Sequence, residues 1–200
     1  MSKFIANVAN VPELLKLQDA DGFYLAGSDL AWQLLGSHEE GLLSASEYAK
    51  FFAYLRAKTK KPLFADGQSG FGNPLNTYFT TKEFEYYGAD IILINDQKYP
   101  SKTAQPRPDD FYSFAGRLKS ALDAHHKSDS QIWAKLDGFT EYGADGLQKR
   151  LALAEKLGAA GALLNAVPAT ATKRLSTKLP LGILNPDNAD NYQKFDYQFK

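Results

Sequence analysis

The chain has 200 residues, of which 44% are hydrophobic and 23% charged, an ordinary composition for a globular protein with one sizeable core. Its 23 Lys and Arg residues balance 23 Asp and Glu residues, so no net field favours a nucleic acid or a membrane as partner. Cysteine is absent, which excludes disulfides, thiolate metal sites and cysteine catalysis.

The N-terminal residues lack the apolar stretch of a signal peptide, and no apolar run approaches the ~18 residues of a membrane span. A cytoplasmic location is therefore expected. The three histidines lack metal-ligand spacing, so no zinc site is expected.

The first 60 residues alternate between apolar runs and helical patterns. We expect strands over 4–8 and 22–26 and helices from residue 11, over 30–35 and over 44–58. Asn10 is a suitable N-cap for the first helix, and Ser44 with Glu47 forms a capping box for the third.

The central stretch, 61–100, reads as strand, Gly-rich loop, helix and strand. A short apolar run over 62–65 ends at Asp66, and Gly67, Gly70 and Gly72 interrupt the pattern after it. Helical spacing over 80–87 stops at Gly88, and a second apolar run over 91–94 is followed by polar residues.

The remaining chain continues the alternation. After a Pro-rich loop over 101–110, we expect helices over 111–124, 142–157 and 169–176, and strands over 131–136, 162–167, 179–184 and near 196–199. Seven or eight βα units in succession imply parallel strands with right-handed crossovers. The sequence predicts a compact (β/α)8 TIM-type barrel in one domain, 1–200, whose last unit is short or incomplete.

Polar residues follow almost every predicted strand. They are Asn7, Gly27, Ser28, Asp66, Gln68, Asn95, Asp96, Lys135, Asp137, Asn165 and Asn185. One such residue usually only caps the next helix, but the carboxyl ends of barrel strands meet at one mouth, where barrel enzymes place their active sites. Together these residues predict a site.

The residue types suggest roles within that site. Asp66 is the best metal candidate, because one carboxylate can hold an Mg²⁺ ion that keeps most of its waters. Gly27 and Ser28 could offer N–H groups to a carboxylate or enolate oxygen. Lys135 could neutralise a second anionic group.

The stretch LFADGQSGFGNPLNTYFTTKEFEYYGADIILINDQKYP resembles the signature of the isocitrate lyase/phosphoenolpyruvate mutase superfamily. The matching positions are Asp66, Gly70, Gly72, Asn73, Asn76, Thr80, Phe84, Glu85, Gly88, Ala89, Ile94 and Asp96. The resemblance implies a (β/α)8 barrel with Mg²⁺, acting on a 2-oxo or 2-hydroxy carboxylate. It implies C–C or P–C bond chemistry next to a carboxylate, through an enolate-like species.

Several positions depart from the family pattern. The residue expected to bind the metal is kept as Asp66, but the surrounding acids become Gln68, Asn95 and, in the loop after the second strand, Glu39. Lys135 replaces an Arg that binds substrate in the family. Loss of the acids is expected to weaken metal binding.

The segment 98–104 is similar to the gating loop of the mutase branch, and the resemblance gives Lys102 and Lys135 catalytic roles. It gives substrate-binding roles to Gly27, Ser28 and Asp66, and the strand-end position adds Asn165 and Asn185. A cysteine-dependent isocitrate or methylisocitrate lyase is excluded, because the lyase loop needs a Cys.

Three interpretations stay open. The chain is an enzyme of the superfamily with altered substrate preference, a degenerate barrel that still binds a small carboxylate or phosphonate, or a purely structural or interaction protein. The last predicts a mouth filled by side chains such as Tyr24, Phe71 or Phe139. The aromatic residues near the end of the sequence should pack on the barrel or on another copy in a homo-oligomer.

Overall fold

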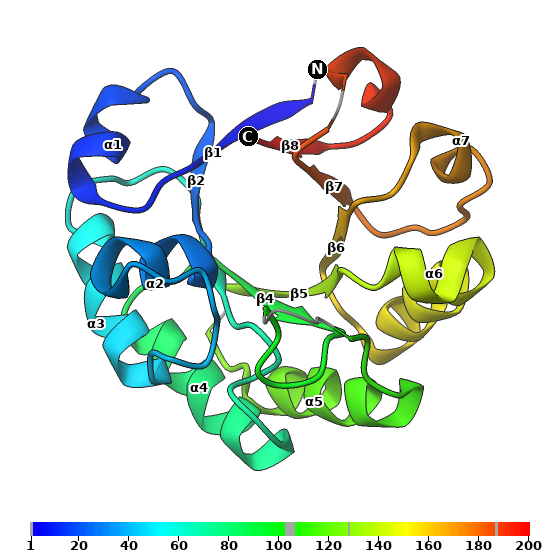
Figure 1. The fold of residues 1–200 in the computed structure, drawn as a ribbon, viewed down its shortest axis with the longest axis horizontal. Coiled ribbons are helices and arrows are strands. Elements are labelled where there is room, and N and C mark those ends of the chain that lie inside the picture. Colours follow the sequence, from blue (N-terminus) through cyan, green and yellow to red (C-terminus); the bar gives the residue numbers. More distant parts are fainter. Residues whose placement is uncertain (1, 103–106, 128, 187) are drawn as a thin grey trace.

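Eight parallel strands close into a barrel, so the predicted (β/α)8 fold is confirmed. The computed structural model describes residues 2–102, 107–127, 129–186 and 188–200. Each strand pairs with the next in sequence, and β8 pairs with β1 to complete the ring. Figure 1 looks down this ring, with the helices outside it and the two termini close together beside β1 and β8.

The element bounds follow the alternation expected from the sequence. The strands are β1 (Lys3–Asn7), β2 (Gly22–Leu25), β3 (Leu63–Asp66), β4 (Ile91–Asn95), β5 (Gln131–Leu136), β6 (Gly161–Asn165), β7 (Leu181–Leu184) and β8 (Tyr197–Phe199). The helices are α1 (Val11–Lys16), α2 (Gly27–Leu35), α3 (Ala45–Arg56), α4 (Pro74–Tyr86), α5 (Phe111–Ala124), α6 (Phe139–Leu157), α7 (Ala169–Thr172) and the 3₁₀ turn η1 (Ala189–Tyr192). The last unit is short, as expected, because β8 has three residues.

Two apolar clusters hold the barrel together. The larger one lies between the strands and the helices around them. The smaller one fills the barrel interior, where Phe64 makes edge-to-face contacts with Trp133 and Phe199 at ring-centroid distances of 5.7 and 5.0 Å. Below its mouth the barrel is therefore a packed core rather than a pore.

Three helices begin earlier than the sequence patterns predict. α4 begins at Pro74, six residues before the expected start, because the Asn73 side chain accepts a 3.0 Å hydrogen bond from the N–H of Asn76 and Pro74 suits the first turn. α2 begins at Gly27 instead of residue 30. α6 begins at Phe139 and is interrupted at Gly143, whose φ is 62°.

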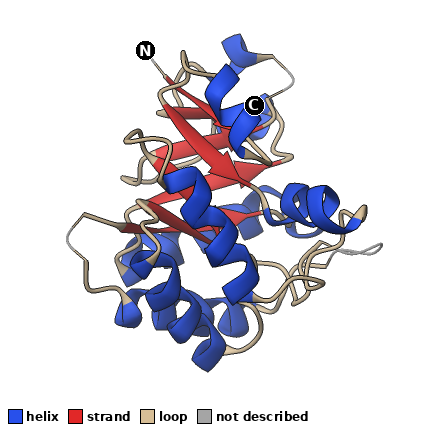
Figure 2. Cartoon of the chain, turned by 90° about the vertical axis from the view of Figure 1, so that its left-hand side faces the viewer, coloured by secondary structure: helices blue, strands red, loops and turns tan. Residues whose placement is uncertain are grey.

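Figure 2 turns the barrel by 90° and shows the strands as a layer with helices packed along them. None of the helices within the described ranges has the length and apolar content needed to cross a membrane.

Candidate functional site

Alternation along the strands determines which side chains face the barrel interior. Phe64, Trp133 and Leu163 belong to the interior cluster, so the residues two positions later face the same way. Those residues are Asp66, Lys135 and Asn165, at the carboxyl ends of β3, β5 and β6. Asn95 pairs directly with Lys135 across β4 and β5.

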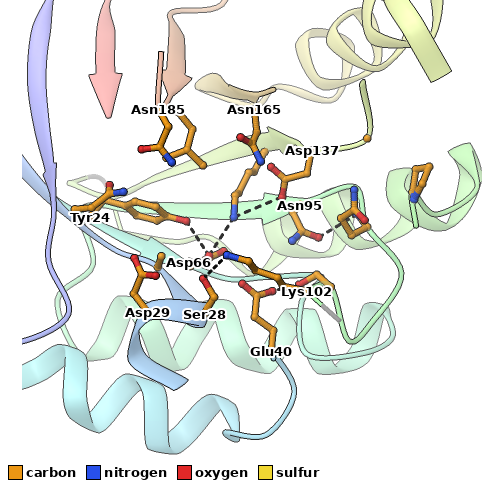
Figure 3. Close-up of a pocket in the computed structure, with 18 of the residues that line it drawn as sticks. Tyr24, Ser28, Asp29, Glu40, Asp66, Asn95, Lys102, Asp137, Asn165 and Asn185 are labelled. Atoms are coloured by element: carbon orange, nitrogen blue, oxygen red, sulfur yellow. Dashed lines mark hydrogen bonds and ion pairs between the residues drawn. The ribbon is translucent and has the colours of Figure 1, made fainter. Parts of the chain in front are cut away.

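These strand ends line a cavity of about 250 Å³, which we call the mouth pocket. Figure 3 shows its side chains pointing toward a common centre from several strands and two loops. Its polar and charged lining residues include Tyr24, Ser28, Asp29, Glu40, Asp66, Asn95, Lys102, Lys135, Asp137, Asn165 and Asn185. The pocket has the location that α/β barrels use for ligands.

Asp66 lies at the base of the mouth pocket and is completely buried. Its Oδ2 accepts hydrogen bonds from the Tyr24 hydroxyl at 2.8 Å, the Lys135 ammonium at 3.1 Å and the Gly27 N–H at 3.2 Å. Its Oδ1 accepts one from the Gln68 N–H at 3.0 Å. Burial acts to raise the pKa of Asp66, but Lys135 and these hydrogen bonds outweigh it and lower the pKa below its usual value.

Lys135 joins two carboxylates. Its Nζ lies 3.1 Å from Asp66 and 3.5 Å from Oδ2 of Asp137, and the lysine side chain is buried. Burial acts to lower the pKa of Lys135, but the charges of Asp137 and Asp66 outweigh it and raise the pKa well above its usual value. Lys135 is therefore charged at neutral pH. Burial also raises the pKa of Asp137, against the lowering effect of Lys135.

Glu40 brings a third carboxyl group into the mouth pocket from the loop after α2. It is 5% exposed and accepts a hydrogen bond from the Ser101 hydroxyl. Burial, followed by the negative charge of Asp66, raises the pKa of Glu40 from 4.5 to about 7. Such a group exchanges a proton readily at neutral pH.

The expectation that Glu39 lies near the metal-binding residue is wrong, because the neighbouring Glu40 occupies the mouth pocket instead. Glu39 is exposed and Glu40 is buried in the mouth pocket. Two adjacent glutamates cannot be distinguished by sequence spacing in an irregular loop. Here the N–H of Glu40 donates to the Lys102 carbonyl at 2.8 Å, which fixes the loop with Glu40 on the inner side.

The segment after β4 lies against this loop. Lys102 Nζ donates a 3.0 Å hydrogen bond to Ser28 Oγ, and both residues line the mouth pocket. The expected gating loop includes residues 103 and 104, which lie outside the described residues.

Most of the residues expected at the site lie together. Ser28, Asp66, Asn95, Lys102, Lys135, Asn165 and Asn185 all line the mouth pocket. Gly27 and Gln68 lie behind it, and each donates its N–H to Asp66. The N–H of Gly27 is thus engaged by the protein.

The described residues do not fit the Mg²⁺ ion expected from the sequence. Asp66 accepts four protein hydrogen bonds, about as many as an ionised carboxylate has lone-pair sites. Its strand-end neighbours, Gln68 and Asn95, are neutral. Within the described ranges, no group of three or more His, Cys, Asp or Glu side chains could hold a metal ion.

Comparison with known proteins identifies the family. The family model described as phosphoenolpyruvate phosphomutase matches residues 8–181. The chain belongs to this family. The resemblance found in the sequence is therefore confirmed.

Individual relatives of this phosphoenolpyruvate phosphomutase family member share about 30% of its residues or fewer over the aligned stretch. The 2,3-dimethylmalate lyase of Eubacterium barkeri is 30% identical over 139 residues, which cover 68% of this chain and 48% of the relative. An oxaloacetate decarboxylase of Ectopseudomonas mendocina is 28% identical over 176 residues, covering 84% of this chain and 60% of the relative. The chain thus spans about half of the length of these relatives.

Solved structures with bound ligands share the fold, and one of them contains both oxalate and Mg²⁺. A crystal structure of phosphonopyruvate hydrolase in complex with oxalate and Mg²⁺ aligns with a TM-score of 0.84 and 20% identity, covering 99% of this chain and 75% of that one. At this identity the likeness concerns the fold.

Among the residues that sequence reasoning did not assign to the polar site, two are central to the mouth pocket. Tyr24 is one of them: it lies in the middle of an apolar strand, and only its inward position brings its hydroxyl to Asp66. Glu40 is the other. The role of Tyr24 could have been predicted, because the hydroxyl group of a buried tyrosine usually has a hydrogen-bond partner.

Proposed function

We propose that this chain binds a small 2-oxo or 2-hydroxy carboxylate in the mouth pocket and breaks a bond next to its carboxylate group. The observation that supports it best is the convergence of two ammonium groups, Lys135 and Lys102, with the Ser28 hydroxyl on one pocket of about 250 Å³. The family and the substrates in the names of the two curated relatives support the same class.

The charges of the residues that line the mouth pocket suggest a role for each in the reaction. When a C–C bond next to the oxo group breaks, the cleaved carboxylate leaves as CO2, and when a P–C bond breaks, the phosphoryl group passes to water as phosphate. In both cases the electron pair of the broken bond stays on the substrate as an enolate, with the negative charge mainly on oxygen. Lys135 is the buried cation that would stabilise this oxygen, because electrostatic stabilisation is strongest away from water. Lys102 would hold the carboxylate that remains.

Glu40 has the properties of the proton donor. With a pKa of about 7 it is protonated in a large fraction of molecules at neutral pH. It would pass its proton to the enolate carbon, become a carboxylate and take a proton back from water. Ser101, which donates a hydrogen bond to Glu40, would orient it.

A second function, carboxylate binding without turnover, is favoured by a specific observation. Gln68 and Asn95 are neutral, and Asp66 is bound by four protein donors. The structural interpretation is less favoured, because a cavity of about 250 Å³ remains at the mouth. Tyr24 lines this cavity, but Phe71 and Phe139 do not.

Calorimetry and a turnover assay test the proposal. Oxaloacetate, phosphonopyruvate, pyruvate and oxalate are titrated into the protein, with and without Mg²⁺, and product release from the first two is followed. We expect heat with at least one compound, and turnover that falls by ~10²-fold or more in Glu40→Gln. Binding without turnover would leave the second function. No heat from any compound would overturn both.

A further inference from the structure

We propose that the ammonium of Lys135 replaces the divalent cation in this site, so that the mouth pocket binds an oxalate-like carboxylate without metal. The inference rests on the proposed function, since it assumes a small carboxylate as ligand. It is carried by the position of the Lys135 ammonium, 3.1 Å from Asp66 and 3.5 Å from Asp137.

Asp66 is already fully occupied by protein donors. Its two oxygens accept one hydroxyl, two backbone N–H groups and one ammonium, all between 2.8 and 3.2 Å. A metal ion bound to this carboxylate would have to displace one of these donors. The displaced group would then be a buried donor without a partner, which is costly.

A metal ion on Asp66 would also be repelled by the positive charge of Lys135. Mg²⁺ binds oxygen at about 2.0–2.1 Å, and Lys135 Nζ lies 3.1 Å from Asp66 Oδ2. An ion on that oxygen would therefore lie within about 5 Å of a charged ammonium, and the side chains of both Asp66 and Lys135 are buried, which strengthens the repulsion. Neither Gln68 nor Asn95 supplies negative charge to offset this repulsion.

Two other carboxyl groups at the mouth pocket, those of Asp137 and Glu40, have protein partners. Asp137 lies 3.5 Å from Lys135, so its charge is already paired with the ammonium. Glu40 accepts a hydrogen bond from Ser101 on the other side of the pocket. Asp137 Oδ2 thus faces an ammonium and Glu40 faces a hydroxyl, whereas Asp137 Oδ1 has no hydrogen-bond partner among the described residues. The mouth pocket is also lined by two further acids, Asp29 and Glu141.

Lys135 can still donate a hydrogen bond to a ligand. An ammonium has three N–H donors, and Asp66 and Asp137 take two of them. Lys135 lines the mouth pocket, so the third is available to an anionic oxygen there. Lys102 adds a second positive charge at the same pocket, and together the two lysines carry the charge of one divalent ion.

Two titrations of the unmodified protein test the proposal, with oxalate as the probe. One is run in EDTA and the other in millimolar Mg²⁺. We expect dissociation constants that agree within about twofold. A more than tenfold gain with Mg²⁺, or binding only with Mg²⁺, would overturn this inference and leave the proposed function intact. No binding in either condition would overturn both.

Variants identify the group that replaces the metal. Lys135→Met should weaken oxalate binding by tenfold or more in EDTA, whereas Lys119→Met, which removes an exposed lysine outside the pocket, should not change it. Equal affinity of Lys135→Met and the unmodified protein would contradict the role of Lys135. If Lys135→Met does not fold, the two titrations above still decide the question of metal.

A further test asks whether a variant with more carboxylates and without the Lys135 ammonium binds a metal ion. The variant Gln68→Asp/Asn95→Glu/Lys135→Met adds two carboxylates and removes the ammonium. Binding of Mn²⁺ alone, followed by electron paramagnetic resonance, should be absent in the unmodified protein and present in this variant. Mn²⁺ binding to the unmodified protein at the mouth pocket, abolished by Asp66→Asn, would overturn the inference.

Discussion

Lys135 Nζ lies 3.1 Å from Asp66 Oδ2, and both side chains are buried. Removal of one partner leaves the other charge buried, so Asp66→Asn should lower the free energy of unfolding at pH 7 by about 3 kcal/mol. Because folding lowers the pKa of Asp66, its contribution is present above the usual carboxyl pKa and is lost as the pH falls through the lower, folded value. Urea unfolding at pH 7 and at pH 3 measures both effects.

The matched control for Asp66 is Asp123→Asn, which removes an ion pair with Lys119 whose side chains are both more than half exposed. We expect a change within about 0.5 kcal/mol. An equal effect of the two substitutions would contradict the view that burial makes the Asp66–Lys135 pair important.

Glu40 makes the stability depend on pH in the opposite direction. Its pKa rises from 4.5 to about 7 on folding, so the folded protein binds more protons than the unfolded chain between these values. The free energy of unfolding should therefore fall as the pH rises from about 4.5 to about 7, by on the order of 3 kcal/mol. In urea unfolding experiments across that range, Glu40→Gln should remove this share of the slope and leave the share of Asp96, whose pKa burial raises to about 6. The exposed neighbour of Glu40 provides the control, since Glu39→Gln should keep the slope.

Lys102 should contribute to ligand binding rather than to stability. Its side chain is exposed and contacts Ser28 at the mouth pocket. Loss of a charged hydrogen bond to a ligand costs roughly 1.5–3 kcal/mol, so Lys102→Met should weaken oxalate binding by about 10–100-fold. The free energy of unfolding should change by less than about 0.5 kcal/mol. Lys98→Met, in the same segment but outside the mouth pocket, should change neither quantity, and an equal loss of affinity would point to a general charge effect.

Substitution of Gly70 should destabilise the protein for two reasons, its backbone conformation and its contact with Thr77. Its φ is 69°, and an added Cβ would lie 1.9 Å from Thr77 Oγ1. Gly36 has a φ of 68° and nothing within 4 Å of an added Cβ. Gly36→Ala should cost only the backbone strain, about 1–2 kcal/mol. Gly70→Ala should cost about 1–3 kcal/mol more, because Thr77 must move. Equal changes in denaturation midpoint would show that the contact with Thr77 relaxes freely.

Most of the fold could be predicted from local patterns. The apolar runs over 62–65 and 91–94 correspond to β3 and β4 within one residue, because strands buried on both faces read as continuous apolar stretches. Where the expectation for α4 was too short, the reason is that its first turn has little apolar periodicity and depends on the Asn73 cap and Pro74.

The site could be predicted less completely. Asp66, Asn95 and Lys135 were identified because each ends a strand. Glu40 was missed, since its burial depends on a hydrogen bond between the loop after α2 and the segment after β4.

By itself, the sequence determined the barrel, the family and the strand ends that meet at the mouth, because these follow from periodicity and motif spacing within short segments. Only the tertiary structure decided that Lys135 pairs with Asp66, since the two residues are 69 positions apart in the chain. Closing the ring of strands brings them within 3.1 Å, and that distance, rather than any local pattern, places an ammonium where the sequence predicted a metal ion.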